Sequence, residues 1–432
     1  MRQRLADKIS DNMAGLWLLV PEHLRLGTWD LLRAWTQQTT ERIEPRLALQ
    51  LVHEAALCTN GLREGRCLTH SGFETLNGLP FLAGDTAIHE LLGSRNVADA
   101  EKLQMDLGKL RRASGHYAGK LLLIDPHRPP SYSQRHMRRY QKDRGSKPIK
   151  TAQMFFCLDG DTAQPLCFTS ANSARTVSQA TPGLLRMAGE ILAPLPEHPL
   201  VAADAEHFAV ELLDHIAEGT PFEIITPMPN RQSNRKRWRQ IPSESFTRHW
   251  AGYATAILPY TPYHSHGGPY YELVQRHGER PEEWYFNAFL STTNRDPVDA
   301  LTRDFPKRWH IEEFFNFNQS LGWRRAGTMN INIRYGHMTM ALVAQTVIHQ
   351  FRKRLGAPFD TCDARSLASN IFRGLDGDVR VVDDTIVITY YNAPHRERLQ
   401  AEYEDLPAKL QAEGVEPKIP WLYGFKLDFR FR

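Results

Sequence analysis

The sequence predicts an α/β fold, in which a mixed sheet follows an all-helical N-terminal domain and precedes an α+β C-terminal segment. Three observations predict it. Apolar residues recur at helical spacing through the first hundred or so residues, short apolar runs alternate with helical stretches from Gly119 onward, and β-rich runs return near the C-terminus. We therefore expect three segments, residues 1–118, 119–355 and 356–432.

Length and composition limit the class of protein. The 432 residues are enough for two or three domains, and the formal net charge of +4 permits a polyanionic partner. The sequence has no apolar run of membrane-spanning length and no signal-peptide pattern at its start, so we expect a cytoplasmic protein. The five cysteines are scattered and odd in number, which fits reduced thiols better than a disulfide framework.

The first segment has a helical pattern. Leu47, Leu51 and Ala55 recur every four residues, and leucines recur similarly over residues 103–110. Such helices either bind DNA or pack on the next domain, and the sequence leaves both functions open.

The second segment opens with a short buried strand. Four apolar residues at 121–124 are followed by Asp125 and then Pro126, which we expect to end the strand because proline cannot donate a backbone hydrogen bond. Alone, Asp125 is typical of a turn before proline. An ionised aspartate at the end of a central strand is nevertheless costly to bury unless a cation pairs with it.

The following elements give the order β-β-β-α-β-α-β. Adjacent parallel strands in this order would bring Asp125 and Asp204 together, which indicates a divalent-metal site. The same patterns predict a hairpin over residues 152–158 and 165–169, a helix over 181–192, a strand over 200–203 that ends before Asp204, a helix over 208–216 and a strand over 221–227.

Two basic stretches are candidates for DNA contacts. Runs of cations are usually solvated loops, but lysine and arginine also neutralise phosphates without reading sequence, and aromatic rings stack on unpaired bases. Trp238 is alternatively a core residue between strands. The candidates after Asp125 are Arg135, Arg138 and Arg139, and those within an insertion at about 228–290 are Arg231, Arg235, Lys236, Arg237, Trp238 and Arg239.

Residues 303–323 predict a helix that supplies a third carboxylate. Asp304 is expected to cap it and Pro306 suits its first turn. Arg308 and Glu312 are four residues apart and therefore share a face. Farther on, residues 338–355 predict another helix, and residues 378–391 predict a hairpin.

In order and in setting, these motifs resemble the DDE transposases of bacterial insertion sequences, in the group like insertion sequence four. The stretches IDPH at Asp125, AADAEHF at Asp204 and RWHIEEFF at Glu312 match the three carboxylates of that family. The catalytic domain of that family is RNase H-like, with a mostly β insertion before the helix that carries the glutamate. The resemblance covers about residues 119–350.

That group also carries a signature of Tyr, two residues, Arg, three residues, Glu, six residues and Lys. Arg308 and Glu312 match it, whereas Phe305 stands at the tyrosine position and Gln319 at the lysine position. The resemblance therefore implies a phosphate contact for Arg308 but leaves the lysine contact without a counterpart.

The resemblance implies a DNA transposase that cleaves element ends and joins them to target DNA by metal-dependent phosphoryl transfer. Asp125, Asp204 and Glu312 would be the catalytic residues and would hold Mg²⁺, with Mn²⁺ as a substitute. The implied partners are double-stranded DNA, as terminal inverted repeats and target, and a second copy of the chain, with residues 356–432 serving dimerisation. His127 and His207, close to the aspartates, fit indirect or phosphate contacts, because Mg²⁺ prefers oxygen ligands.

Two other functions stay open. An RNase H-like nuclease or resolvase would use the same three carboxylates without strand transfer. A domesticated DNA-binding protein derived from a transposase would no longer cut, and Phe305 and Gln319 leave room for it. The insertion and the basic stretches favour the transposase.

Overall fold

The computed structural model describes residues 9–11, 13–39, 42–59, 71–131, 134, 136, 139–141, 145–171, 174–323 and 330–432. Its contacts group the chain into two compact units. Unit 1 combines Met1–Ser114 with Phe315–Arg432, and unit 2 is Gly115–Phe314. The C-terminal residues thus share a unit with the N-terminal helices, whereas the sequence pattern predicts three consecutive segments.

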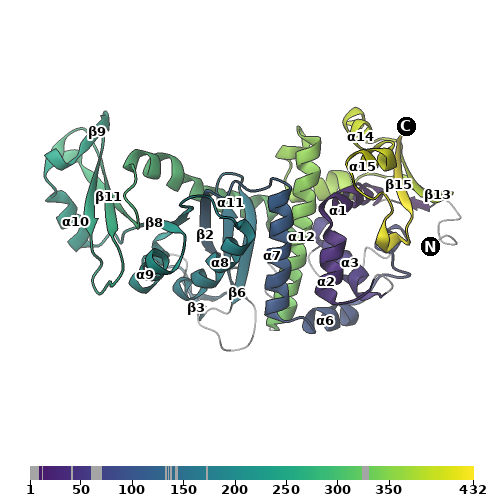
Figure 1. Cartoon of the computed structure of the whole chain (residues 1–432), viewed down its shortest axis with the longest axis horizontal. Coiled ribbons are helices and arrows are strands. Elements are labelled where there is room, and N and C mark those ends of the chain that lie inside the picture. Colours follow the sequence, from purple (N-terminus) through teal and green to yellow (C-terminus); the bar gives the residue numbers. More distant parts are fainter. Residues whose placement is uncertain are drawn as a thin grey trace. The chain divides into compact units, whose positions relative to one another are not determined.

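Unit 1 is built around one long helix, α12 (Ile331–Leu355), which packs on α3, α6 and α7. Figure 1 shows α12 running alongside α7. Because α12 is buried around most of its circumference, it forms the centre of a bundle and not a surface helix. The N-terminal helices are η1 (Ala14–Leu19), α1 (Val20–Leu26), α2 (Thr28–Thr36), α3 (Glu44–Ala56), α5 (Ser71–Leu76), α6 (Asp85–Gly93) and α7 (Val97–Ala113).

A four-stranded sheet with the order β1-β13-β14-β15 completes unit 1. The predicted C-terminal hairpin is confirmed as β13 (Gly377–Val382) and β14 (Thr385–Tyr390). β1 (Ile9–Asp11) pairs antiparallel with β13, so the prediction of an all-helical N-terminal part was wrong. A strand this close to the N-terminus is stabilised by a partner far away in the sequence, which local periodicity does not reveal.

The chain end forms β15 (Lys426–Phe431), parallel to β14. Two helices, α14 (Arg396–Tyr403) and α15 (Leu406–Ala412), pack on β15. Short helical turns connect α12 to this sheet: η9 (Phe359–Thr361), α13 (Ala364–Leu367) and η10 (Ala368–Phe372).

Unit 2 contains a nine-stranded mixed sheet with the order β6-β5-β2-β7-β8-β12-β11-β10-β9. Its first five strands and two helices lie where the sequence predicts them. They are β2 (Leu121–His127), β5 (Gln153–Asp159), β6 (Gln164–Ala171), α8 (Val177–Leu192), β7 (Leu200–Ala203), α9 (Val210–Gly219) and β8 (Glu223–Pro227). A two-stranded ribbon, β3 (Arg139–Tyr140) and β4 (Ile149–Lys150), lies between β2 and β5 in sequence.

β2 continues past the proline that was expected to end it. It pairs in parallel with β7 only as far as Ile124, but it pairs antiparallel with β5 through Pro126 to His127. Beyond Ile124 the strand has a neighbour on one side only, and a proline is tolerated where its missing N–H faces the open side.

The insertion extends the sheet. β12 (Tyr285–Ser291) pairs antiparallel with β8, and β11 (Tyr270–His277), β10 (Tyr253–Tyr260) and β9 (Thr247–Trp250) follow in order. Figure 1 shows these strands continuing from β8 with α10 (Gln232–Arg239) beside them. The insertion is thereby a part of the same hydrogen-bonded sheet.

The predicted glutamate helix consists of three successive helical pieces. A π-type turn η6 (Asp299–Asp304) leads into the 3₁₀ turn η7 (Phe305–Trp309) and then into α11 (His310–Asn318). Asp304 makes no side-chain cap bond, so the predicted cap was wrong. The helical stretch starts earlier, where the backbone N–H of Asp299 donates to the carboxylate of Asp296 at 2.9 Å. None of the described helices is long and apolar enough to cross a membrane.

Candidate active site

Asp125 and Asp204 each follow the last paired residue of two neighbouring parallel strands. The pairing of β2 with β7 ends at Ile124 and Ala203; Asp125 is the next residue of β2, and Asp204 is the first residue after β7. Both carboxylates therefore lie at the same edge of the sheet, as the sequence predicts. On the neighbouring β8, the Thr226 hydroxyl donates to the carbonyl oxygen of Asp204 at 2.7 Å and fixes the chain there.

Arg308 joins this pair of aspartates to Glu312. Its Nη1 lies 3.4 Å from Oδ1 of Asp125, and its Nη2 lies 3.9 Å from Oε1 of Glu312. The shared face predicted for Arg308 and Glu312 is confirmed, and η7 packs against both β2 and β7. The predicted residues Asp125, Asp204, Arg308 and Glu312 thus belong to one cluster.

The turn between β5 and β6 holds the helical segment that carries Arg308 and Glu312. Nζ of Lys307 lies 2.6 Å from the carboxylate of Asp161, and Nδ1 of His310 lies 2.9 Å from the carbonyl oxygen of Gly160. The turn is itself rigid, because the buried carboxylate of Asp159 accepts hydrogen bonds from surrounding backbone N–H groups.

Negative charge accumulates around Asp125. The pKa of Asp125 is raised to about 7, mainly by burial and next by the charge of Asp204. The Arg308 and Arg128 guanidinium groups lower this pKa, while Glu312 raises it. Two other carboxylates therefore act on Asp125 in the same direction as burial, and a bound cation would relieve this repulsion.

His207 keeps Asp204 ionised. Its ring is buried, and Nδ1 lies 2.6 Å from Oδ1 of Asp204. An ionised carboxylate can only accept, so Nδ1 is assigned as the donor. Burial raises the pKa of Asp204, but the hydrogen bond and charge of His207 and the backbone N–H of Glu206 lower it more, so that it ends below its ordinary value. His207 thus orients a carboxylate, which agrees with the indirect role predicted for it.

Arg128 and Glu206 form an ion pair beside the cluster. The sequence did not reveal this ion pair. The Arg128 guanidinium donates to both Glu206 carboxylate oxygens, at 2.9 and 2.5 Å, and its Cζ atom lies 4.4 Å from the ring centroid of Tyr140. These contacts connect the end of β2, the turn after β7 and the β3–β4 ribbon. The only available signal was that Glu206 lies two residues after Asp204.

The carboxylates of the cluster are suitable ligands for a hard divalent cation, although in the observed arrangement they do not surround a common metal position. In the described part of the chain, no group of three or more His, Cys, Asp or Glu side chains is arranged to hold a metal ion. Asp125, Asp204 and Glu312 nevertheless offer only carboxylate oxygens, which Mg²⁺ prefers. The raised pKa of Asp125 also indicates negative charge that a cation would stabilise. Between Asp125 and Glu312 lies the guanidinium of Arg308.

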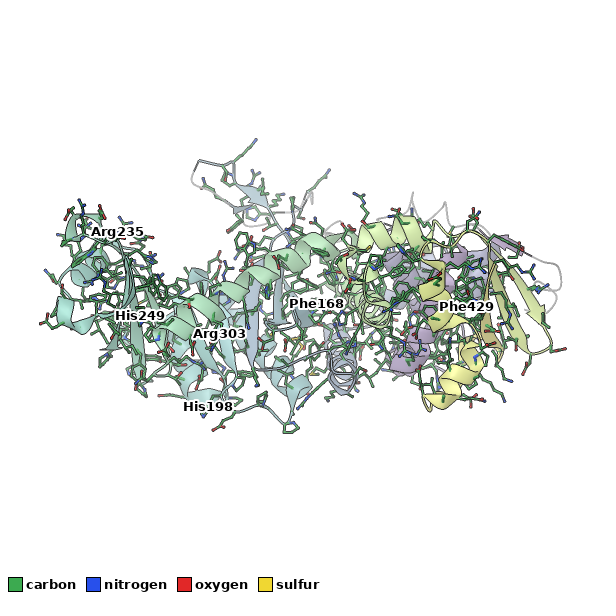
Figure 2. All side chains as sticks on the ribbon, turned by 90° about the horizontal axis from the view of Figure 1, so that it is seen from above. Phe168, His198, Arg235, His249, Arg303 and Phe429 are labelled. Atoms are coloured by element: carbon green, nitrogen blue, oxygen red, sulfur yellow. The ribbon has the colours of Figure 1, made fainter. Side chains whose placement is uncertain are left out.

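The basic helix α10 has two kinds of cation. Arg237 pairs with the buried Glu272, and the Cζ atom of Arg237 lies 5.1 Å from the ring centroid of Tyr260. These contacts anchor Arg237 on the sheet, and its predicted DNA contact stays a prediction. In Figure 2 the side chain of Arg235 is at the surface. The exposed cations of this stretch are Arg231, Arg235, Lys236 and Arg239.

Trp238 is a core residue, so the predicted stacking of its ring on DNA bases was wrong. Its side chain is only 1% exposed, and its Nε1 donates to Oε1 of Glu272 at 2.7 Å. Trp238 is the one large apolar side chain in the sequence QSNRKRWR, so it is the residue with which α10 can bury apolar surface on the sheet.

The basic stretch after Asp125 is described only in part. Arg139 is exposed on β3. Arg135 and Arg138 lie outside the described residues, so their predicted DNA contacts stay predictions. Of the two signature positions that differ from the family, Phe305 packs its ring on Phe289 at 4.7 Å between centroids, and Gln319 opens the short turn η8 (Gln319–Leu321).

A surface cleft of about 170 Å³ adjoins the exposed arginines of α10. Arg235 and Arg239 line it together with Trp284 and Tyr285, neither of which the sequence indicates as a DNA contact. Tyr285 stacks on His277 at 4.6 Å, and the Arg276 guanidinium lies 3.9 Å from the ring centroid of Trp284. Rings and cations gather here because paired strands bring distant residues together, which spacing alone does not show.

Comparisons with known proteins find similarity to solved structures but not to known sequences. No protein-family model matches the chain, and no curated protein matches it by sequence. Among solved structures, the chain is similar to the piggyBac transposase in its synaptic complex with hairpin DNA, with a TM-score of 0.45 and 12% identity, covering 84% of this chain and 80% of that one. A fold does not specify a reaction, which has to be argued from side chains.

Proposed function

We propose that this chain is a DNA transposase in which Asp125, Asp204 and Glu312 perform divalent-metal-dependent phosphoryl transfer. The observation that carries the proposal is the parallel register that ends at Ile124 and Ala203, because it sets two aspartates side by side at one sheet edge. The helical segment with Arg308 and Glu312 adds the third carboxylate and a cation.

The proposed core is RNase H-like. It is supported by the strand order β6-β5-β2-β7-β8, in which β5 is antiparallel to β2 while β7 and β8 are parallel to it. The insertion between β8 and the glutamate helix also agrees with the family that the sequence resembles.

The cluster supplies what phosphodiester cleavage requires. When bound, divalent cations neutralise charge on the attacking and leaving oxygens and make water a stronger nucleophile. Asp125, Asp204 and Glu312 would hold Mg²⁺, or Mn²⁺ in its place, through carboxylate oxygens. His207 keeps Asp204 ionised and oriented, and Arg308 can donate two parallel hydrogen bonds to a phosphate.

The proposed partner is double-stranded DNA, as the terminal inverted repeats of an element and as target. The exposed cations Arg231, Arg235, Lys236, Arg239 and Arg139 would contact the phosphate backbone. Because two element ends have to be processed together, we also propose a homodimer. Light scattering of the purified chain with paired end duplexes tests this, and a monomeric complex would contradict it.

The experiment that tests the proposal uses duplexes that carry inverted repeats found in the DNA flanking the gene. With Mg²⁺, wild-type protein should nick these ends and join the freed 3′ hydroxyl to a second duplex. Asp125→Asn, Asp204→Asn and Glu312→Gln should abolish both steps. Glu313→Gln is the matched control, because Glu313 is the exposed next residue of α11 and its substitution should leave both steps unchanged.

Each alternative has a distinct result in this assay. Nicking without joining would identify a nuclease or resolvase. Duplex binding without Mg²⁺-dependent nicking would identify a domesticated DNA-binding protein. Wild-type nicking by Asp125→Asn would contradict the assignment of the site.

A further inference from the structure

We infer that Arg308 is a built-in counter-cation, whose guanidinium competes with divalent cations for Asp125 and Glu312 until a DNA phosphate draws it away. This inference rests on the proposed function, because it concerns the same carboxylates. It adds a regulatory property, namely that binding of the cation and binding of DNA are coupled through one side chain.

The position of Arg308 supports competition. Its two terminal nitrogens face two different carboxylates, Nη1 toward Asp125 at 3.4 Å and Nη2 toward Glu312 at 3.9 Å. A guanidinium stays protonated at any ordinary pH, so its charge cannot be removed to make room for another cation. A divalent cation shared by Asp125 and Glu312 would have to occupy the space between these carboxylates, which the guanidinium fills. The two therefore exclude each other.

The contacts are also weak enough to be broken. Both distances are longer than those of a good charged hydrogen bond, so Arg308 is held mainly by the charge of the cluster. About a fifth of its side chain is exposed, which leaves a path toward solvent. Arg308 can therefore turn outward without the loss of strong hydrogen bonds.

A phosphate diester is the ligand that would draw Arg308 outward. Its oxygens match the planar guanidinium and can accept two parallel hydrogen bonds from it. The Glu312 carboxylate, at 3.9 Å from Nη2 of Arg308, accepts no such pair of hydrogen bonds. When the guanidinium binds phosphate, Asp125 and Glu312 lose their counter-charge and attract a divalent cation more strongly. Coupling of this kind is reciprocal, so the cation must also strengthen DNA binding.

The test measures Mn²⁺ binding to the full chain by electron paramagnetic resonance, with and without a blunt-ended DNA duplex, after subtraction of Mn²⁺ bound by the duplex alone. Wild-type protein should bind Mn²⁺ about tenfold more tightly with the duplex, equivalent to about 1.4 kcal/mol. Arg308→Gln should bind Mn²⁺ about tenfold more tightly than wild type without DNA and gain little from the duplex. Arg308→Lys keeps the charge and should restore weak binding without DNA.

Arg303→Gln is the matched control. Arg303 is exposed, lies five residues earlier in the same helical segment, and pairs with Asp299 and Asp304. This substitution removes the same charge away from the cluster and should leave Mn²⁺ affinity unchanged.

Failure of this inference is distinguishable from failure of the proposed function. If Asp125→Asn abolishes Mn²⁺ binding while Arg308→Gln binds Mn²⁺ like wild type, the result supports the metal site and contradicts the role of Arg308 as a counter-cation. If Asp125→Asn binds Mn²⁺ like wild type, both are overturned. If Arg308→Gln does not fold, the wild-type comparison decides, because an affinity that is equal with and without the duplex contradicts the coupling.

Discussion

Nδ1 of the buried His207 lies 2.6 Å from Oδ1 of Asp204, just beyond the end of β7. A histidine that donates to a carboxylate in this way fixes its direction and keeps it ionised. In the proposed metal site, this contact would orient Asp204 even without a bound cation, and one substitution can remove it.

The first prediction concerns this histidine. His207→Ala should raise the Mg²⁺ concentration needed for nicking and reduce the rate by about 10–100-fold, because a carboxylate without its orienting partner binds metal less well. Nicking rates measured over a range of Mg²⁺ concentrations test this. The control is His215→Ala, at an exposed position of α9. Equal Mg²⁺ dependence in His207→Ala and wild type would show that the hydrogen bond has no functional role.

The second prediction concerns the exposed cations of α10. Arg235→Ala and Arg239→Ala should each weaken DNA binding regardless of sequence and reduce the slope of log affinity against log salt by about one, because each removes a phosphate contact. Fluorescence anisotropy at several salt concentrations measures both effects. Trp238→Phe provides the contrast, since a buried side chain that is 1% exposed should not change the slope. Unchanged slopes in both arginine variants would exclude α10 from the DNA interface.

The third prediction concerns Glu272, which is fully buried and accepts hydrogen bonds from Arg237 and Trp238. Glu272→Ala leaves the buried indole N–H without an acceptor and should lower the free energy of unfolding by about 1–3 kcal/mol. Chemical denaturation measures the change, with exposed Glu282→Ala as control. A loss no larger than that of Glu282→Ala would mean that the Glu272 contacts do not stabilise the sheet.

The fourth prediction concerns the pH dependence of unit 1. The pKa of Glu22 is raised from 4.5 to about 7, because burial outweighs the opposing effects of Arg25 and of the Tyr403 hydroxyl at 3.0 Å. Between these pH values the folded protein keeps a proton that the unfolded chain releases. Stability should therefore fall as pH rises from about 4.5 to about 7, by up to about 3 kcal/mol.

Glu22→Gln should remove this contribution, because glutamine does not titrate. The measurement is the thermal unfolding midpoint of the variant and of wild type across the same pH range. Exposed Glu397→Gln serves as control and should follow wild type. Parallel pH curves for Glu22→Gln and wild type would contradict the prediction.

The sequence was sufficient to predict that Asp125 and Asp204 lie together at one edge of the sheet. Short apolar runs before Asp125 and Asp204 predict buried strands, and the order of elements predicts that the strands are neighbours. The spacing of Arg308 and Glu312 likewise predicts their shared helix face. These features depend on local periodicity and on topology rules, which a single sequence contains.

The failures have tertiary causes. Trp238 lies among cations in the sequence, but Glu272, from a strand more than thirty residues later, provides the acceptor that lets its indole be buried. Pro126 does not end its strand, because β7 leaves that side open. The pairing of β1 with β13 joins opposite ends of the chain, and no local pattern indicates such a partner.

The proposed function requires that Asp125, Asp204 and Glu312 jointly hold divalent cations. The most direct test is the anomalous scattering of Mn²⁺ in crystals of the full chain bound to an end duplex. We expect an anomalous peak in contact with the carboxylates of Asp125 and Asp204, and we expect this peak to be lost in Asp125→Asn. Mn²⁺ bound only at other places, with none at these two carboxylates, would show that they are not metal ligands.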